Sequence, residues 1–335
     1  MAQYHEGRGR AQVPAQHENA RRARSSILMS AETSSNQQDP MPPAKADLAT
    51  MWAYIEKGID QIMSGGASHH TITSLHNVVY NYCTCSRIIT QPDTVPTLPS
   101  PDLYNHLIRY FDNHLKALRM ESDSLQDEAL LQYYAAQWGR YTTAARSINR
   151  IFAYLDRNWI TQQRKKGRKD LFPVYTLALV QWKSEFFLPV QGPNQKLSSA
   201  ILHVIERERN GETIDQDLLK KVVDSFVSLG LDESDIGKNS YEVYHEHLEA
   251  PFLDATERYY RYESEKFLAE HSAADYRKKA EEWLREEQDR VERYMDANTR
   301  DVLVQKCEDV LFRAHTELID EGTPGAAAAE ADQKP

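Results

Sequence analysis

Apolar residues recur along the chain with the spacing of α-helices. From residue 131 they alternate at intervals of three and four, at Leu131, Tyr134, Trp138, Tyr141, Ala145, Ile148, Phe152, Leu155 and Trp159. This spacing predicts one helix of about eight turns with a continuous buried stripe. A second stretch fits the same period with one miss at Glu287: Tyr276, Ala280, Trp283, Val291 and Tyr294. It predicts another long amphipathic helix.

Prolines are absent from 102–172 and from 252–323, and alternating strand patterns are nearly absent. Long proline-free stretches of this charge density favour helices. We expect an all-α protein, with helices at about 47–64, 71–87, 101–121, 126–163, 171–187, 195–209, 215–229, 241–270, 273–297 and 299–319.

The helical pattern breaks midway, at Pro189, Gly192 and Pro193. Five predicted helices precede this break and five follow it, which indicates two similar five-helix bundles stacked as an elongated stalk. The first bundle would span 47–190 and the second 191–320. Residues 1–46 and 321–335 are polar or of low complexity, and both predict disordered tails. Arginines in the first tail raise a transit peptide as an alternative, but its acidic residues disfavour one.

Composition limits the kinds of partner. The 335 residues include 40 Lys and Arg against 50 Asp and Glu, a net charge of −10, so neither nucleic acid nor an anionic membrane is an expected partner. No apolar run approaches a membrane span, and three cysteines cannot form a disulfide framework in a chain of this length. We expect a protein of the cytoplasm and nucleus.

Motifs for catalysis or cofactor binding are lacking. No glycine-rich phosphate loop opens a predicted helix, and no catalytic triad can be assembled with any specificity. Cys83 and Cys85 would lie about 200° apart around a helix, which favours a core role for Cys83 over a metal site. His69, His70 and His76 lack further ligands nearby, so a solvated loop is favoured. We expect no enzyme, no cofactor and no metal.

Two charge clusters have ordinary structural interpretations. Glu281, Glu282, Glu286 and Glu287 are interleaved with Lys and Arg, and they predict the salt-bridged outer face of a helix. The run 164–169 holds five cations, at Arg164, Lys165, Lys166, Arg168 and Lys169. A solvated turn after a helix C-terminus is the favoured interpretation, while a nuclear-import signal or a phosphate-binding patch stays open.

Aromatic residues are more informative than the polar motifs. Eighteen tyrosines and five tryptophans exceed what helix packing needs, and tyrosine is common where a surface holds a partner. The stretch 171–175, LFPVY, is apolar on nearly every side. We therefore expect one of its faces to contact another molecule.

Several segments together resemble the N-terminal region of a cullin, most nearly that of the SCF ubiquitin ligases and of its fungal members. These segments are VYNYCT (79–84), AYLDRNW (153–159), GRK (167–169), VYTLALVQW (174–182), IERERNGETI (205–214), FLDATERYYRYES (252–264), KKAEEWLREEQDRVERYM (278–295) and KCEDVL (306–311). They occur in the family's order over about 47–320, which makes the resemblance specific.

The resemblance implies a non-catalytic stalk of five-helix cullin repeats. It also implies that the second and fifth helices of the first repeat bind an Skp-type adaptor carrying an F-box substrate receptor. Carried over by motif, the implied adaptor-binding residues are Ile72, His76, Val78, Val79, Tyr82, Leu171, Phe172, Val174 and Tyr175. We expect Val78 and Tyr175 to lie on the surface, as interface anchors.

The sequence departs from the family in two respects. Where cullins usually carry a Tyr-Met pair and a further Tyr, this chain has Ile72, Thr73 and His76. This difference favours, as an alternative, a helical structural or assembly protein that has lost adaptor binding. In addition, the final segment GTPGAAAAEADQKP does not resemble the family's third repeat or its RING-binding, modifier-accepting region. We therefore expect a natural truncated form, a gene-model error or an engineered fragment, with no RING protein as partner.

Overall fold

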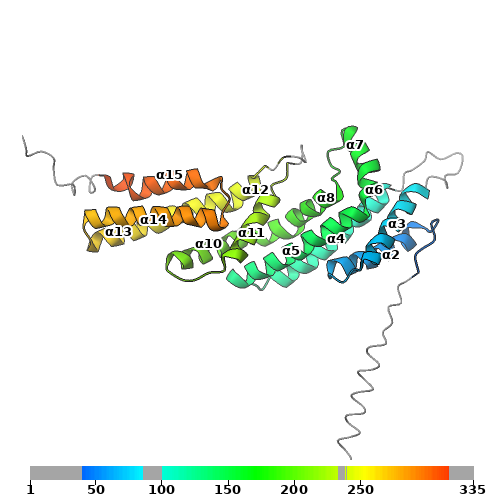
Figure 1. Ribbon diagram of the computed structural model, residues 1–335, viewed down its shortest axis with the longest axis horizontal. Helices are drawn as coiled ribbons and strands as arrows, with labels where there is room; N and C mark the ends of the chain where they lie inside the picture. Colours follow the sequence, from blue (N-terminus) through cyan, green and yellow to red (C-terminus); the bar gives the residue numbers. More distant parts are fainter. Residues whose placement is uncertain (1–39, 86–99, 233–237, 239, 317–335) are drawn as a thin grey trace, which may run out of the picture. The chain divides into compact units, whose positions relative to one another are not determined.

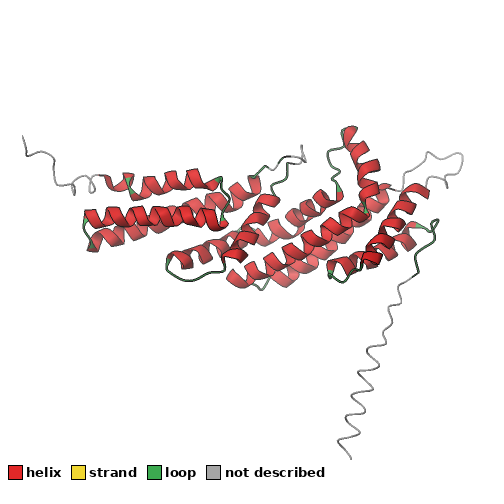
Figure 2. Ribbon diagram, viewed as in Figure 1, coloured by secondary structure: helices red, strands yellow, loops and turns green. Residues whose placement is uncertain are grey.

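The computed structural model describes residues 40–85, 100–232, 238 and 240–316 (Figure 1). Within these ranges the regular structure is helical and contains no β-strand (Figure 2). The helices belong to one compact unit that begins at Pro42. No helix in the described part of the chain is both long and apolar enough to cross a membrane. The all-α prediction is confirmed.

The predicted helices all have counterparts, several of them divided. In the predicted first repeat they are α2 (Leu48–Met63), α3 (His69–Cys85), α4 (Ser100–Ser122), α5 (Asp127–Ile151), α6 (Ala153–Leu155), η2 (Asp156–Ile160), α7 (Thr161–Lys165), α8 (Val174–Gln181), η3 (Trp182–Phe187) and α9 (Leu188–Gln191). In the predicted second repeat they are α10 (Lys196–Arg209), α11 (Gln216–Ser228), α12 (Glu242–Tyr244), η4 (His245–Glu249), α13 (Ala250–Glu270), α14 (Ala273–Tyr294), α15 (Thr299–Leu311) and η5 (Arg313–His315).

The predicted helix 126–163 is interrupted rather than continuous. The backbone of Phe152 leaves the helical region at φ −92° and ψ 13°, and a π-helical turn follows at Asp156–Ile160. Similar π-helical turns lie at Trp182–Phe187 and His245–Glu249. A π-turn adds a residue without changing the apolar periodicity much, and such turns are frequent at functional sites.

Local sequence explains where several helices begin. Asp47 accepts a hydrogen bond from the Thr50 backbone N–H at 2.8 Å, and Asp215 caps α11 through the Leu218 N–H at 2.9 Å. Ser272 caps α14 in the same way through the Asp275 N–H. Each side chain satisfies a donor that the first helical turn leaves unpaired, which stabilises the start of the helix by about 1 kcal/mol.

An aromatic cluster forms the core of the predicted first repeat. Trp182 is fully buried, and its ring packs against Tyr134, Tyr141 and Phe186 at centroid distances of 5.7, 5.0 and 4.6 Å. The Tyr141 hydroxyl donates to the Ala178 carbonyl at 2.9 Å, so a buried polar group is satisfied. The stripe predicted from residue 131 lies in this core, except that Trp138 is only half-buried.

The core continues across the predicted boundary at residues 190 and 191. Helix α5 packs against both α10 and α11. The Tyr134 hydroxyl lies 3.0 Å from the hydroxyl of Ser225, and the rings of Phe187 and Phe226 meet edge to face at 4.9 Å. The two groups of helices therefore stack through a shared apolar interface, and the position of the boundary stays a prediction.

The prediction that Glu287 lies on an outer helix face is wrong. Its side chain is fully buried and accepts hydrogen bonds from Arg209 Nε at 2.9 Å, Arg290 Nη1 at 2.8 Å and the Tyr260 hydroxyl at 2.7 Å. The side chains of Arg209 and Arg290 are 4% and 5% exposed. Burial raises the pKa of Glu287, but the two arginines outweigh it and hold the pKa below its ordinary value.

The other three glutamates of that cluster are exposed, as predicted. Glu281 pairs with Arg277 at 3.6 Å, and Glu282 pairs with Lys279 at 3.1 Å. Such surface pairs contribute little to stability.

Candidate functional site

The nine residues implied to bind an adaptor divide into two classes. Five of them are buried in the core: Val78, Val79, Tyr82, Leu171 and Val174. Ile72, His76, Phe172 and Tyr175 are partly exposed. The expectation that Val78 lies on the surface is wrong, since it is 1% exposed. Helix α3 packs against both α2 and α5, so it buries a wider face that includes adjacent residues.

The outward face of α3 carries a residue that the sequence analysis missed. Tyr80 is 45% exposed, and Thr73 and Asn77 on the same face are also exposed. The ring of Tyr80 meets the half-buried Tyr154 edge to face, at a centroid distance of 5.0 Å. The helical spacing of residues 73, 76, 77 and 80 could have identified this face, because these positions lie on the side of the helix opposite the buried ones.

The start of α8 is held by side chains from neighbouring elements. The Tyr104 hydroxyl accepts the Phe172 N–H at 2.9 Å and donates to the Phe172 carbonyl at 3.0 Å. Asp156 accepts the Val174 N–H at 3.0 Å, and Asn149 accepts the Tyr175 N–H at 3.1 Å. These bonds replace the partners that a helix N-terminus lacks, so they fix the backbone from which Phe172 and Tyr175 project.

Two arginines lie over the partly exposed rings of this segment. Arg164 lies 5.9 Å from the centroid of the Phe172 ring, and Arg146 lies 5.7 Å from that of Tyr175. Arg164 also donates to the Leu171 carbonyl at 2.6 Å. Each cation covers one side of an aromatic ring and restricts its movement.

The face of α3 and the start of α8 are connected through α5, α6 and η2. Tyr154 in α6 contacts Tyr80, while Asp156 in η2 and Asn149 in α5 bind the backbone of α8. We name this region the α3–α8 surface and define it by its partly exposed side chains: His76, Tyr80, Tyr154, Phe172 and Tyr175.

The burial of Asp156 affects the electrostatics of this region. Burial raises its pKa to about 6, although the hydrogen bond from Val174 and the charge of Arg157 oppose the shift. Because the carboxylate is desolvated in the folded chain, the folded state binds a proton more readily than the unfolded state. The support that Asp156 gives to α8 is therefore sensitive to pH near 6.

The basic run forms a turn, as the favoured interpretation predicted. Gly167 adopts φ +94°, which a residue with a side chain rarely adopts, and Lys165, Lys166 and Lys169 are exposed. Arg168 forms a 2.7 Å ion pair with Asp170. Lys165, Lys166 and Lys169 form no ion pair with a described residue, and the import and phosphate interpretations stay predictions.

Comparison with known proteins identifies the family. The cullin alpha solenoid domain matches residues 52–328, which is most of the chain.

The chain belongs to the cullin family.

It is 37% identical over 283 residues to Cullin-1 of Dictyostelium discoideum and 33% identical over 276 residues to Cullin-1 of Schizosaccharomyces pombe. It is 29% identical over 303 residues to cell division control protein 53 of Saccharomyces cerevisiae. These alignments cover 81%, 80% and 83% of this chain, and 36% of each relative. The cullin chain thus spans about a third of the length of these relatives, and the resemblance inferred from its motifs is confirmed.

Membership of the cullin family also indicates a non-catalytic scaffold. The described residues of this cullin hold no group of three or more His, Cys, Asp or Glu side chains suited to a metal ion. Cys83 is 2% exposed, which confirms its predicted place in the core. His69 and His70 are exposed at the start of α3.

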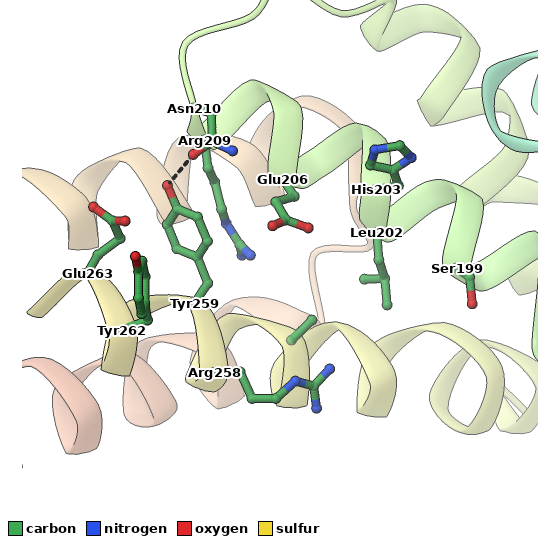
Figure 3. A pocket seen from close by; sticks show the side chains of 11 residues that line it. Ser199, Leu202, His203, Glu206, Arg209, Asn210, Arg258, Tyr259, Tyr262 and Glu263 are labelled. Atoms are coloured by element: carbon green, nitrogen blue, oxygen red, sulfur yellow. Dashed lines mark hydrogen bonds between the residues drawn. The ribbon is translucent and has the colours of Figure 1, made fainter. Parts of the chain in front are cut away.

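Hollows in the described part of this cullin also lie outside the α3–α8 surface as defined, and two of them are considered in turn. One, with a volume of about 790 Å³, is lined by α2, α3, α5 and Lys221, and Ile72 contributes to its wall. The other, of about 580 Å³, lies between α10 and α13 (Figure 3). In the second hollow Tyr259 donates to Asn210 at 3.1 Å, and the rim mixes Glu206, Glu263 and Arg258. Mixed charge gives that hollow no clear preference for an anionic or cationic partner.

Proposed function

We propose that this chain is the adaptor-binding part of a cullin scaffold, which holds an Skp-type adaptor together with an F-box substrate receptor. The observation that carries the proposal is the α3–α8 surface, where partly exposed aromatic residues stand on an anchored backbone. Family membership and the similarity to Cullin-1 and cell division control protein 53 support it.

The chemistry of this surface suits protein recognition. Tyrosine and phenylalanine supply contact area with few rotatable bonds, and arginine restricts two of the rings before any partner arrives. Hydrogen bonds from Tyr104, Asp156 and Asn149 fix the α8 backbone, so little conformational entropy is lost on binding. A partner would thus gain affinity from a few ordered anchors.

Size-exclusion chromatography tests the proposal. The purified chain is mixed with an Skp-type adaptor bound to an F-box protein, and the fractions are analysed for all three components. We expect a single complex that elutes before each component alone. Separate elution of a folded chain at micromolar concentrations would contradict the proposal.

A second candidate function is a helical structural or assembly protein that has lost adaptor binding. The first turns of α3 support it, because this chain has Ile72, the exposed Thr73 and the half-buried His76 where cullins usually carry a Tyr-Met pair and a further Tyr. A short polar residue offers less apolar contact area. If the folded chain fails to bind the adaptor but forms homo-oligomers, this second function is favoured.

We further propose that the chain is present in both cytoplasm and nucleus. Support comes from its composition and from the exposed lysines of the 164–169 turn, which are accessible to an import receptor. Imaging of the tagged chain tests this distribution, and exclusion from either compartment would contradict it.

A further inference from the structure

The hollow beside the α2–α3 turn combines an apolar wall with a cationic rim. Ile62, Met63 and Ile72 supply large apolar side chains, while α5 supplies small residues such as Ala136 and Gly139. The small residues on α5 leave space that the neighbouring helices do not fill. The hollow has a volume of about 790 Å³, which is room for several large aliphatic side chains.

The charges at the rim have one sign. Among the described residues that line this hollow, Arg140 and Lys221 alone are charged, and both are exposed. Neither forms an ion pair with another residue in the described ranges, whereas the adjacent Lys220 pairs with Asp224. A chain with a net charge of −10 therefore presents two available cations beside an apolar wall.

The shape favours a segment of protein over a small molecule. The wall contributed by α5 runs from Ala135 to Ser147, a length of about 18 Å at 1.5 Å per residue. That length matches about three turns of a helix laid along α5. Apolar residues at helical spacing would face the wall, and acidic residues beside them would meet Arg140 and Lys221.

We propose that this hollow binds an acidic amphipathic helix of a partner protein, with its apolar side chains against Ile62, Met63 and Ile72 and its carboxylates paired with Arg140 and Lys221. Ile72 is also among the residues implied to bind the adaptor, but this assignment rests on the charge and shape of the hollow and is tested with a peptide and variants that do not involve the adaptor. The two cations attract the acidic helix and set its orientation, while the apolar wall holds it.

The test measures fluorescence anisotropy of a fluorescein-labelled helical peptide with leucine at every third or fourth position and glutamate between them. We expect saturable binding that weakens as salt is raised, because the rim pairs are exposed. Two matched peptides test the two kinds of contact. One has lysine in place of glutamate and tests the charge of the rim, and the other has serine in place of leucine and tests the apolar wall. Each should bind at least about tenfold more weakly than the parent peptide.

Two variants of the chain assign the binding to the hollow. Gly139→Leu fills it, and a Cβ at this position meets no atom within 4 Å, so the helix can accept the change. Arg140→Glu with Lys221→Glu reverses the charge of the rim. Each variant should bind the glutamate peptide at least about tenfold more weakly than the parent chain does. The matched controls, Ala129→Leu on the same helix and Lys278→Glu with Arg285→Glu on α14, replace exposed residues outside the hollow and should change affinity by less than about twofold.

Several results would overturn the proposal. They are equal binding of the glutamate and lysine peptides, unchanged affinity in both hollow variants with a preserved melting temperature, or no binding by the parent chain. Binding of sodium decanoate without binding of the peptide would assign the hollow to an acyl anion instead. Self-association that Gly139→Leu abolishes would assign it to a second copy of the chain.

Discussion

Replacing Glu287 should destabilise the chain far more than replacing its neighbour Glu286. In the Glu287→Gln variant, the buried Arg209 loses its carboxylate partner, whereas Arg290 keeps a 3.2 Å ion pair with Glu208. Burying cations without their counter-charge is the costly case, and breaking such a pair costs about 3–5 kcal/mol. Since Gln preserves the shape and one acceptor oxygen, we expect a loss of about 2–4 kcal/mol in the free energy of unfolding.

Urea unfolding followed by circular dichroism measures this loss. The matched control is Glu286→Gln, because Glu286 lies one residue away, is 49% exposed and only approaches Arg290 at 3.8 Å. The control should lose less than about 0.5 kcal/mol. If the two variants unfold at the same urea concentration with the same slope, the buried network does not stabilise the fold and the reasoning is refuted.

The pH dependence of unfolding provides a second test of the same network. The pKa of Glu287 is lower in the folded chain than its ordinary value of 4.5. The stabilisation is therefore complete above the unfolded pKa and is lost as the pH falls through the folded pKa. Between pH 7 and pH 3 the parent chain should lose more stability than Glu287→Gln. An equal loss in both would contradict the role of the carboxylate.

Three further predictions concern single positions or short segments. Trp159 is 8% exposed and packs against Tyr104, so Trp159→Ala should cost about 3–5 kcal/mol in urea melts, and a loss below about 1 kcal/mol would contradict its place in the core. Burial raises the pKa of Asp156 to about 6, so ionisation of its carboxyl lowers the free energy of unfolding as the pH rises from about 4 to 6. Asp156→Asn keeps an acceptor oxygen for the Val174 N–H, and its free energy of unfolding relative to the parent chain should be about 1–2 kcal/mol higher at pH 7.5 than at pH 4.5. A difference between variant and parent that does not change with pH would refute the assignment. Replacing Lys165, Lys166 and Lys169 with Ser or Gln should leave melting temperature, adaptor binding and nuclear fraction unchanged if they form only a solvated turn, and selective loss of nuclear signal would establish an import role.

Helices and their buried stripes could be predicted because apolar spacing reports directly on which face is covered. The stripe from Leu131 to Trp159 lies in the core with Trp138 half-buried, and Cys83 is buried as its position suggested. The interruption at Phe152 and the π-turn after it could not be predicted. A π-turn shifts the helical register by one residue, and a pattern of threes and fours accommodates such a shift.

The wrong predictions for Glu287 and Val78 have a common physical cause, since residues distant in sequence determine whether these side chains are buried. The charged neighbours of Glu287 favour a surface position, while its partner Arg209 lies 78 residues earlier. A single apolar stripe on α3 does not require Val78 in the core, but α3 packs against both α2 and α5, and Val78 is buried between them and the rest of the core. Tyr80 is a separate case: it lies off the buried stripe of α3, where the apolar pattern does not single out a residue, and it is 45% exposed.

Adaptor affinity in a Tyr80→Ala, Tyr175→Ala double variant tests the central claim most directly. Tyr80 is 45% exposed and Tyr175 is half-buried, so the variant should stay folded with a modest fall in melting temperature, whereas Val78→Ala would remove a core side chain. Isothermal titration with an Skp-type adaptor bound to its F-box protein should show affinity weakened by about thirtyfold or more, the effect of losing about 2 kcal/mol at an interface anchor. Tyr262→Ala, which removes a 64% exposed tyrosine on α13, is the matched control and should bind like the parent. If the folded double variant binds as tightly as the parent and the control, the α3–α8 surface is not the adaptor site.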